Sequence, residues 1–219
     1  MQYCGFRKTS FVRIGIIFSL ALLILSLFSG SKTLADTDFK ANQSDGKATQ
    51  SPGDLWQPKE GRDLLGQPAP EFQGLKWLSG QSYSMASLRG HVVLIRFWLA
   101  GCPLCVDSAD TLNDIYKQYS KHGLVVLGIH HPKSKDTRNA DVVRQAAAVL
   151  KFDFPVAMDN QWQTINRFWL TRQRSFTSAT LLIDKRGTII WVHDGGVLGE
   201  GSPAVRSLRA KIESALAKN

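Results

Sequence analysis

Two cysteines separated by two residues are the most informative chemical feature of this chain. Cys102 and Cys105 enclose Pro103 and Leu104, directly after an apolar run and directly before a helical pattern. Two cysteines at this spacing on the first turn of a helix can form a disulfide and reopen it, and the partial positive charge of the helix N-terminus favours the thiolate of the first cysteine. The motif therefore predicts a dithiol/disulfide redox site.

The composition limits the classes of protein that fit this sequence. Cys4 precedes the first apolar segment, so Cys102 and Cys105 are the only cysteine pair in the rest of the chain, and a scaffold held by several disulfides is excluded. Four of the 27 basic residues lie in residues 1–35, which leaves 23 basic and 18 acidic residues elsewhere. This mild excess shows no basic stripe interleaved with aromatic residues, so nucleic-acid binding is not expected.

Residues 1–35 have the pattern of an export signal. Basic residues precede a continuous apolar run over residues 14–28, and small and polar residues follow up to Ala35. The run is shorter than the roughly 20 residues that a membrane-spanning helix needs, so it predicts a cleaved signal peptide. The alternative is an uncleaved anchor in the inner membrane. Both interpretations place the cysteine pair in an exported, periplasmic or other extracytoplasmic compartment, where disulfides persist.

The rest of the chain divides into a linker and one domain. Residues 36–62 are polar with little apolar periodicity, which predicts a flexible linker. Residues 63–219 alternate strand and helix patterns and end with a hairpin and a helix, which predicts an α/β domain with a mixed central β-sheet flanked by helices. The expected strands are residues 91–98, 124–129, 154–158, 179–183 and 188–193, and the expected helices are residues 105–121, 139–150, 161–170 and 203–218.

Four short segments of this domain occur in a characteristic order and spacing. They are residues 66–72, residues 84–90, the strand that ends in the cysteine pair, and residues 181–187. With these segments the chain resembles the exported TlpA/ResA-type thiol–disulfide oxidoreductases, redoxins (AhpC/TSA-like) of the thioredoxin-like superfamily. The resemblance implies a thioredoxin-like fold.

The resemblance also implies a division of roles between the two cysteines. Cys102 is expected to attack a substrate disulfide, and Cys105 to resolve the mixed disulfide that forms. The implied partners are protein thiols or disulfides and a membrane-bound or soluble redox protein, and contact with the membrane is expected only through the N-terminal segment. No cofactor is required beyond the Cys102–Cys105 disulfide.

Several positions near the cysteines depart from the pattern of this family. Ser178 stands where relatives have a cis-proline that blocks metal capture and orients the substrate, and Arg96 stands where an acid or asparagine is common. Ser108 and Asp110 replace a glutamate and a helix-kinking proline, whereas Trp98 matches the aromatic residue next to the family's active site. The loss of the proline puts the exclusion of metal in doubt, and no equivalent of the proton-relaying acid is evident.

Arg96 allows two interpretations. If its guanidinium lies beneath the cysteines, it stabilises the thiolate of Cys102 and makes the disulfide more oxidising. Alternatively, strand alternation points Arg96 away from the cysteines, toward solvent or a carboxylate. Reactivity of Cys102 in an Arg96→Ala variant separates the two interpretations.

His130 and His131 provide an alternative function for the cysteine pair. They follow the second strand, at the edge of the sheet where thioredoxin-like sites open, and one imidazole could join Cys102 and Cys105 in a copper or zinc site. Successive strand residues point to opposite faces, so at most one of the two is expected to approach the cysteines. The ordinary alternative is a histidine that hydrogen-bonds within a loop.

Two further alternatives concern the whole domain. A thiol peroxidase is disfavoured because Trp98 occupies the position, four residues before Cys102, where such enzymes carry a threonine. A degenerate domain used only for protein interaction is allowed by Ser178. Trp98, Trp162, Phe168 and Trp169 could form a platform for a substrate, but the helical spacing of the last three favours core packing. The basic cluster of Arg167, Arg172 and Arg174 predicts a solvated face.

Overall fold

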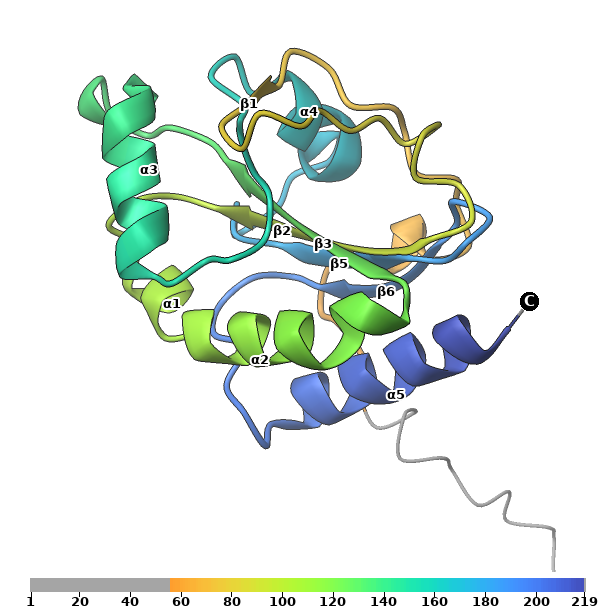
Figure 1. Ribbon diagram of the computed structural model, residues 1–219. Coiled ribbons are helices and arrows are strands. Elements are labelled where there is room, and N and C mark those ends of the chain that lie inside the picture. Colours follow the sequence, from red (N-terminus) through yellow and green to blue (C-terminus); the bar gives the residue numbers. More distant parts are fainter. Residues whose placement is uncertain (1–55, 219) are drawn as a thin grey trace, which may run out of the picture. The chain divides into compact units, whose positions relative to one another are not determined.

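A six-stranded sheet in the order β1-β4-β3-β2-β5-β6 forms the centre of the fold. Figure 1 shows the sheet with helices around it. The computed structural model describes residues 56–218; the predicted signal or anchor, residues 1–35, and the linker residues 36–55 lie outside the described residues. β2 (Val92–Trp98) pairs in parallel with β3 (Leu124–His130) and antiparallel with β5 (Thr180–Ile183). All seven residues of β2 are buried, which explains its continuous apolar run, because a strand covered on both faces does not alternate.

Each predicted strand and helix has a counterpart, although the bounds differ by a few residues. The two-residue strand β1 was not predicted, and the described residues include no helix that is long and apolar enough to cross a membrane. The elements are η2 (Arg62–Leu64), β1 (Lys76–Trp77), β2 (Val92–Trp98), α1 (Pro103–Val106), α2 (Ala109–Tyr119), η3 (Ser120–His122), β3 (Leu124–His130), η4 (Asp136–Arg138), α3 (Ala140–Val149), β4 (Val156–Met158), α4 (Gln163–Ile165), η5 (Asn166–Leu170), β5 (Thr180–Ile183), β6 (Ile189–His193) and α5 (Pro203–Ala217).

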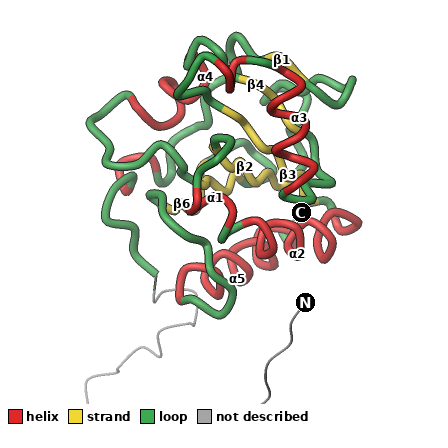
Figure 2. The backbone as a smooth tube through the Cα atoms, turned by 90° about the vertical axis from the view of Figure 1, so that its left-hand side faces the viewer, coloured by secondary structure: helices red, strands yellow, loops and turns green. Residues whose placement is uncertain are grey.

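Helices cover both faces of the sheet. α2 and α5 lie side by side against one face, as both views of the backbone show (Figures 1 and 2), and α4 lies against the other. Strand alternation divides β2 between the two layers: Val92 and Leu94 pack with α2 and α5, whereas Ile95 and Phe97 pack with α4 and η5. Arg96 continues the alternation of Val92 and Leu94, so its side chain lies on the face that carries the helix after the cysteines.

The helix after the cysteines is not continuous, contrary to the prediction of one helix over residues 105–121. α1 ends at Val106 and α2 begins at Ala109. Between them, the Ser108 hydroxyl donates a hydrogen bond to the Leu104 carbonyl at 2.7 Å. A serine that bonds the carbonyl four residues earlier bends a helix, so Ser108 separates the cysteine-bearing turn from the longer helix.

The end of the predicted linker packs onto the domain. Trp56 Nε1 donates to the Val192 carbonyl at 3.1 Å, and the Trp56 ring stacks on His193 with 5.2 Å between the ring centroids. The backbone amides of Lys59 and Glu60 donate to Asp194 Oδ2 at 2.9 and 3.1 Å. The prediction of a flexible linker is therefore wrong for residues 56–62, because its polar residues have partners more than 130 positions away.

Gly61 is the residue of this segment that tolerates least change. Its φ is +86°, and a Cβ there would lie 2.6 Å from Trp169 Cζ3 and 2.8 Å from Val192 Cγ1. The left-handed conformation alone costs a non-glycine residue about 1–2 kcal/mol. We expect Gly61→Ala to lower the free energy of unfolding by more than this, as measured by urea denaturation.

Gly80 provides the matched control for this prediction. Its φ is +79°, and a Cβ there would have no heavy atom within 4 Å. Gly80→Ala therefore carries the backbone cost without the steric clash. Equal losses of stability in the two variants would contradict close packing of residues 56–62 against Trp169.

Candidate active site

The two cysteines lie at different depths. Cys102 is half-buried and precedes α1, whereas Cys105 is 1% exposed inside α1, and both are free thiols. Burial raises the pKa of the Cys105 thiol, while the charge of Arg96 and a hydrogen bond from the Leu99 backbone act in the opposite direction. A macromolecular substrate can thus reach Cys102, with Cys105 sheltered behind it.

Arg96 is fully buried beneath this pair. Its Nη1 donates to Thr180 Oγ1 at 2.9 Å, and its Nη2 donates to the Gly196 carbonyl at 3.2 Å and to Ser108 Oγ at 3.4 Å. The guanidinium also interacts with Cys105. Its desolvation lowers the pKa of Arg96, and the neighbouring Cys105 opposes that effect. The alternative that Arg96 points to solvent or to a carboxylate is therefore wrong, because its strand position places it under the cysteine-bearing turn.

Trp98 forms the apolar wall behind Cys105. Its ring is fully buried, packs with Cys105, and makes edge contacts with His130 and Phe152 at centroid distances of 5.1 and 5.3 Å. A buried ring cannot form a platform for a substrate. Trp98 instead shields the inner thiol from water.

His130 and His131 lie on opposite faces of the sheet, as strand alternation predicts. The His130 ring contacts Trp98, whereas His131 Nε2 lies 2.9 Å from Thr177 Oγ1 and its ring contacts Trp162. Within residues 56–218, no group of three or more His, Cys, Asp or Glu side chains is placed to hold a metal ion. The structure therefore does not bring the cysteines and a histidine together as the ligand set considered above.

Ser178 lies beside the cysteine-bearing loop. Arg96 is opposite Thr180 in the antiparallel register of β2 and β5, and the Phe97 amide donates to the Ala179 carbonyl at 2.9 Å. The same register, continued by two residues, brings Ser178 opposite Trp98. Ser178 is 3% exposed, and its position opposite the cysteines stays a prediction from the resemblance.

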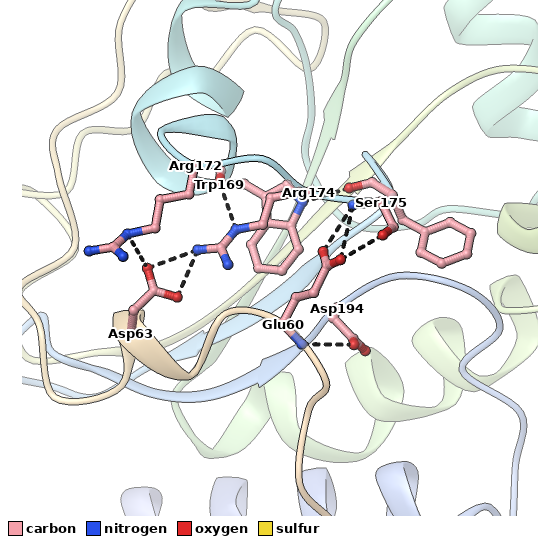
Figure 3. A network of polar contacts seen from close by, with 8 residues as sticks. Glu60, Asp63, Trp169, Arg172, Arg174, Ser175 and Asp194 are labelled. Atoms are coloured by element: carbon pink, nitrogen blue, oxygen red, sulfur yellow. Dashed lines mark hydrogen bonds and ion pairs between the residues drawn. The ribbon is translucent and has the colours of Figure 1, made fainter.

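The loop that leads to Ser178 is held by residues of the 56–63 segment (Figure 3). The Glu60 carboxylate accepts hydrogen bonds from the Ser175 amide at 2.9 Å and the Ser175 hydroxyl at 2.6 Å. These bonds lower the pKa of Glu60. The sequence offered no signal for this contact, because Glu60 and Ser175 are 115 positions apart.

Arg174 strengthens the same attachment. It forms an ion pair with Asp63 at 2.8 Å, and its guanidinium carbon lies 4.7 Å from the centre of the Trp169 ring. Arg172 also pairs with Asp63, at 3.1 Å. The Arg174 side chain is only 6% exposed, so the prediction of a solvated basic face is wrong for Arg174. Trp169 is fully buried, as expected for a core residue.

An apolar groove of about 340 Å³ opens beside Cys102. It runs between α1 and α3, which are neighbours in Figure 1. Val106 and Val149 line it and are 53% and 75% exposed, and Gln145 is the polar side chain in its lining. The sequence predicted both helices but not this groove, since helical periodicity does not show which helices lie side by side.

The model of the AhpC/TSA family matches residues 65–192, which is more than half of the 219 residues. The chain belongs to the AhpC/TSA family. The family resemblance predicted from the four short segments is thereby confirmed.

Several relatives of this AhpC/TSA family member have names that refer to thiol chemistry. Thiol-disulfide oxidoreductase YkuV of Bacillus subtilis is 27% identical over 60% of this chain and 86% of its own length. Thiol-disulfide oxidoreductase ResA of Geobacillus thermodenitrificans is 28% identical over 57% of this chain and 66% of its own length. Protein DipZ of Mycobacterium bovis is 33% identical over 55% of this chain, but the match spans only 17% of DipZ.

Solved structures confirm the predicted fold of this AhpC/TSA family member. A thioredoxin-like protein in its oxidised form has a TM-score of 0.57 and 27% identity, over 70% of this chain and 97% of its own. The expected thioredoxin-like α/β fold is therefore present.

Proposed function

We propose that this chain is an exported thiol–disulfide oxidoreductase that exchanges electrons with protein thiols through the Cys102–Cys105 pair. The observation that carries the proposal is the difference in depth between the two thiols, with Cys102 half-buried at the surface and Cys105 buried behind it. The relatives YkuV and ResA are named thiol-disulfide oxidoreductases, which supports the reaction class. Export rests on the sequence pattern of residues 1–35, and the redox partner is expected among exported or membrane-bound proteins.

The proposed reaction proceeds through a mixed disulfide. A substrate thiolate attacks the Cys102 sulfur, the bond to Cys105 breaks, and the bonding electron pair stays on Cys105. A second substrate thiolate then attacks the substrate sulfur of the mixed disulfide and releases Cys102. The substrate dithiol loses two electrons and the cysteine pair gains them; the reverse sequence reduces a substrate disulfide.

The groove beside Cys102 favours a substrate with apolar residues next to its cysteine. The exposed Val106 and Val149 offer surface that an apolar segment can cover, and burial of apolar area contributes about 25 cal/mol per Å². Cys102 also lines the groove, so a substrate segment bound there holds its own cysteine sulfur close to the Cys102 sulfur.

Trapping of the mixed disulfide tests the proposal. In a Cys4→Ser background, Cys105→Ser should accumulate a mixed disulfide with the disulfide-linked dimer of a cysteine peptide flanked by leucines. The Cys102 thiolate attacks the peptide disulfide and releases one peptide thiolate, and no second thiol of the protein resolves the product. Cys102→Ser should accumulate none, and a peptide flanked by aspartates should react more slowly with Cys105→Ser. Equal trapping by the two variants, or the absence of any reversible couple with glutathione in the unmutated pair, would contradict the proposed function.

A further inference from the structure

Arg96 is a buried cation whose hydrogen-bond acceptors are all neutral. Within residues 56–218 it forms no ion pair, and the oxygens that it reaches belong to the Thr180 and Ser108 hydroxyls and the Gly196 carbonyl. Its Nε has no oxygen acceptor. A charge removed from water is stabilised most by hydrogen bonds together with an opposite charge. The surroundings of Arg96 therefore supply hydrogen bonds to neutral oxygens but no anionic partner.

The neighbouring histidines do not supply an anion or a competing cation. His131 and His193 interact electrostatically with Arg96, and burial lowers the pKa of His131 to about 3 and that of His193 to about 4. Both rings are consequently neutral at neutral pH. The nearby Asp194 carboxylate accepts hydrogen bonds from the backbone of the 56–63 segment.

Cys105 is the side chain beside Arg96 that acquires negative charge during the reaction. The guanidinium reaches the cysteine-bearing turn through Ser108, whose Oγ lies 3.4 Å from Arg96 Nη2 and donates to the Leu104 carbonyl. It interacts electrostatically with Cys105, and less strongly with Cys102. In the disulfide neither sulfur carries a charge. When the disulfide opens, the electron pair of the broken bond stays on Cys105 and provides the anion that Arg96 lacks.

We propose that Arg96 stabilises the negative charge on Cys105 as the Cys102–Cys105 disulfide opens, and thereby makes this disulfide a better electron acceptor. This inference rests on the proposed function and deepens it. One of the two interpretations from the sequence is that Arg96 stabilises the thiolate of the attacking Cys102; we assign it instead to the departing Cys105. Stabilising the leaving thiolate accelerates the attack of a substrate thiol on Cys102, and stabilising the reduced pair raises its reduction potential.

Neutral and charge-conserving variants of Arg96 test this assignment. Oxidised full-length Arg96→Met should be opened by dithiothreitol about tenfold more slowly than the unmutated protein. Its equilibrium with glutathione should shift toward the disulfide by about tenfold, which for two electrons corresponds to a potential about 30 mV lower. Arg96→Lys, which keeps the cation, should recover most of both losses. Alkylation of reduced Cys102 by iodoacetamide should change far less than the opening rate.

Ile95→Val and Ser108→Asp complete the set of variants. Ile95 is fully buried on the face of β2 opposite to Arg96, so Ile95→Val controls for disturbed packing and should leave the opening rate nearly unchanged. Ser108→Asp adds a carboxylate where Ser108 Oγ already lies 3.4 Å from Arg96 Nη2. The new carboxylate pairs with the Arg96 guanidinium before the disulfide opens, so the Cys105 thiolate gains less from Arg96. Ser108→Asp should therefore slow disulfide opening as Arg96→Met does. This variant decides the question if Arg96→Met does not fold.

The outcomes separate this inference from the proposed function. If the unmutated pair forms no reversible couple with glutathione, the proposed function itself fails. If the couple is reversible but Arg96→Met and Ser108→Asp open at the unmutated rate, the role of Arg96 is wrong and the oxidoreductase function stands. If Arg96→Met slows the alkylation of Cys102 as much as it slows disulfide opening, Arg96 stabilises the thiolate of Cys102 rather than that of Cys105.

Discussion

Acidification from neutral pH to about pH 4 should remove most of the stability of this domain. His130, His131 and His193 are between 0% and 4% exposed. Burial lowers the pKa of His130 and His193 to about 4 and that of His131, which His130 also disfavours through charge, to about 3. The fold thus requires three neutral imidazoles, and protonation of any of them favours the unfolded chain.

The sign of this effect follows from the protons bound in each state. In the unfolded chain each histidine titrates near pH 6.5, so below that pH the unfolded state binds more protons and the free energy of unfolding decreases as the pH falls. Each histidine accounts for about 3 kcal/mol by pH 4. Three such losses are comparable with the whole stability of an ordinary domain, roughly 5–15 kcal/mol.

Urea denaturation at several pH values measures this loss. His193→Phe keeps an aromatic ring between Trp56 and Trp191, on which His193 stacks, but removes its titration. The decrease in stability between neutral pH and about pH 4 should therefore be smaller by about 3 kcal/mol in this variant. His122→Phe is the control, because His122 is exposed. If both variants lose as much stability in acid as the unmutated protein, His193 is not the cause.

Replacement of Trp169 should have the largest effect of a single core substitution outside the cysteine-bearing turn. Its ring is fully buried, its Nε1 donates to the Phe176 carbonyl at 2.6 Å, and Arg174 lies over its face. Trp169→Ala leaves a cavity, an unpaired carbonyl and a loosened Arg174, and should cost about 3–5 kcal/mol of unfolding free energy. Because Trp169 anchors the loop before Ser178, disulfide exchange should also slow in the variant that remains folded.

Trp169→Phe separates the contributions to this loss. It retains most of the apolar ring but not the donor to Phe176, so it should cost about 1–3 kcal/mol, the penalty for an unsatisfied buried acceptor. Denaturant midpoints of the two variants, together with the rate of disulfide opening, provide the measurement. A loss in Trp169→Ala no larger than in Trp169→Phe would show that the ring itself contributes little.

Much of the architecture could be predicted from local patterns. The apolar run of β2 indicated a strand buried on both faces, and the spacing of apolar residues located α2, α3 and α5 within a few residues. These signals are local because strand and helix periodicities repeat over a few residues. The break at Ser108 was missed, since a side-chain bond to the Leu104 carbonyl leaves no trace in the periodicity.

The arrangement around the cysteines was only partly predictable. The sequence could place Ser178 near the pair through the resemblance, and it could assign His130 and His131 to opposite faces through strand alternation. It could not assign Arg96 a partner, because Thr180 and Gly196 are 84 and 100 positions away. Nor could it show that Glu60 holds Ser175, as the polar composition of residues 36–62 is the same whether those residues are free or docked.

The sequence by itself determined the cysteine pair, its place between a buried strand and a helix, and the family, because spacing, periodicity and short motifs are properties of neighbouring residues. Only the tertiary structure decided what surrounds that pair. The burial of Arg96 among neutral acceptors, the neutral buried histidines and the attachment of the 56–63 segment all depend on contacts between distant parts of the chain. Burial gives these contacts their strength, since charges and hydrogen bonds removed from water interact more strongly than exposed ones.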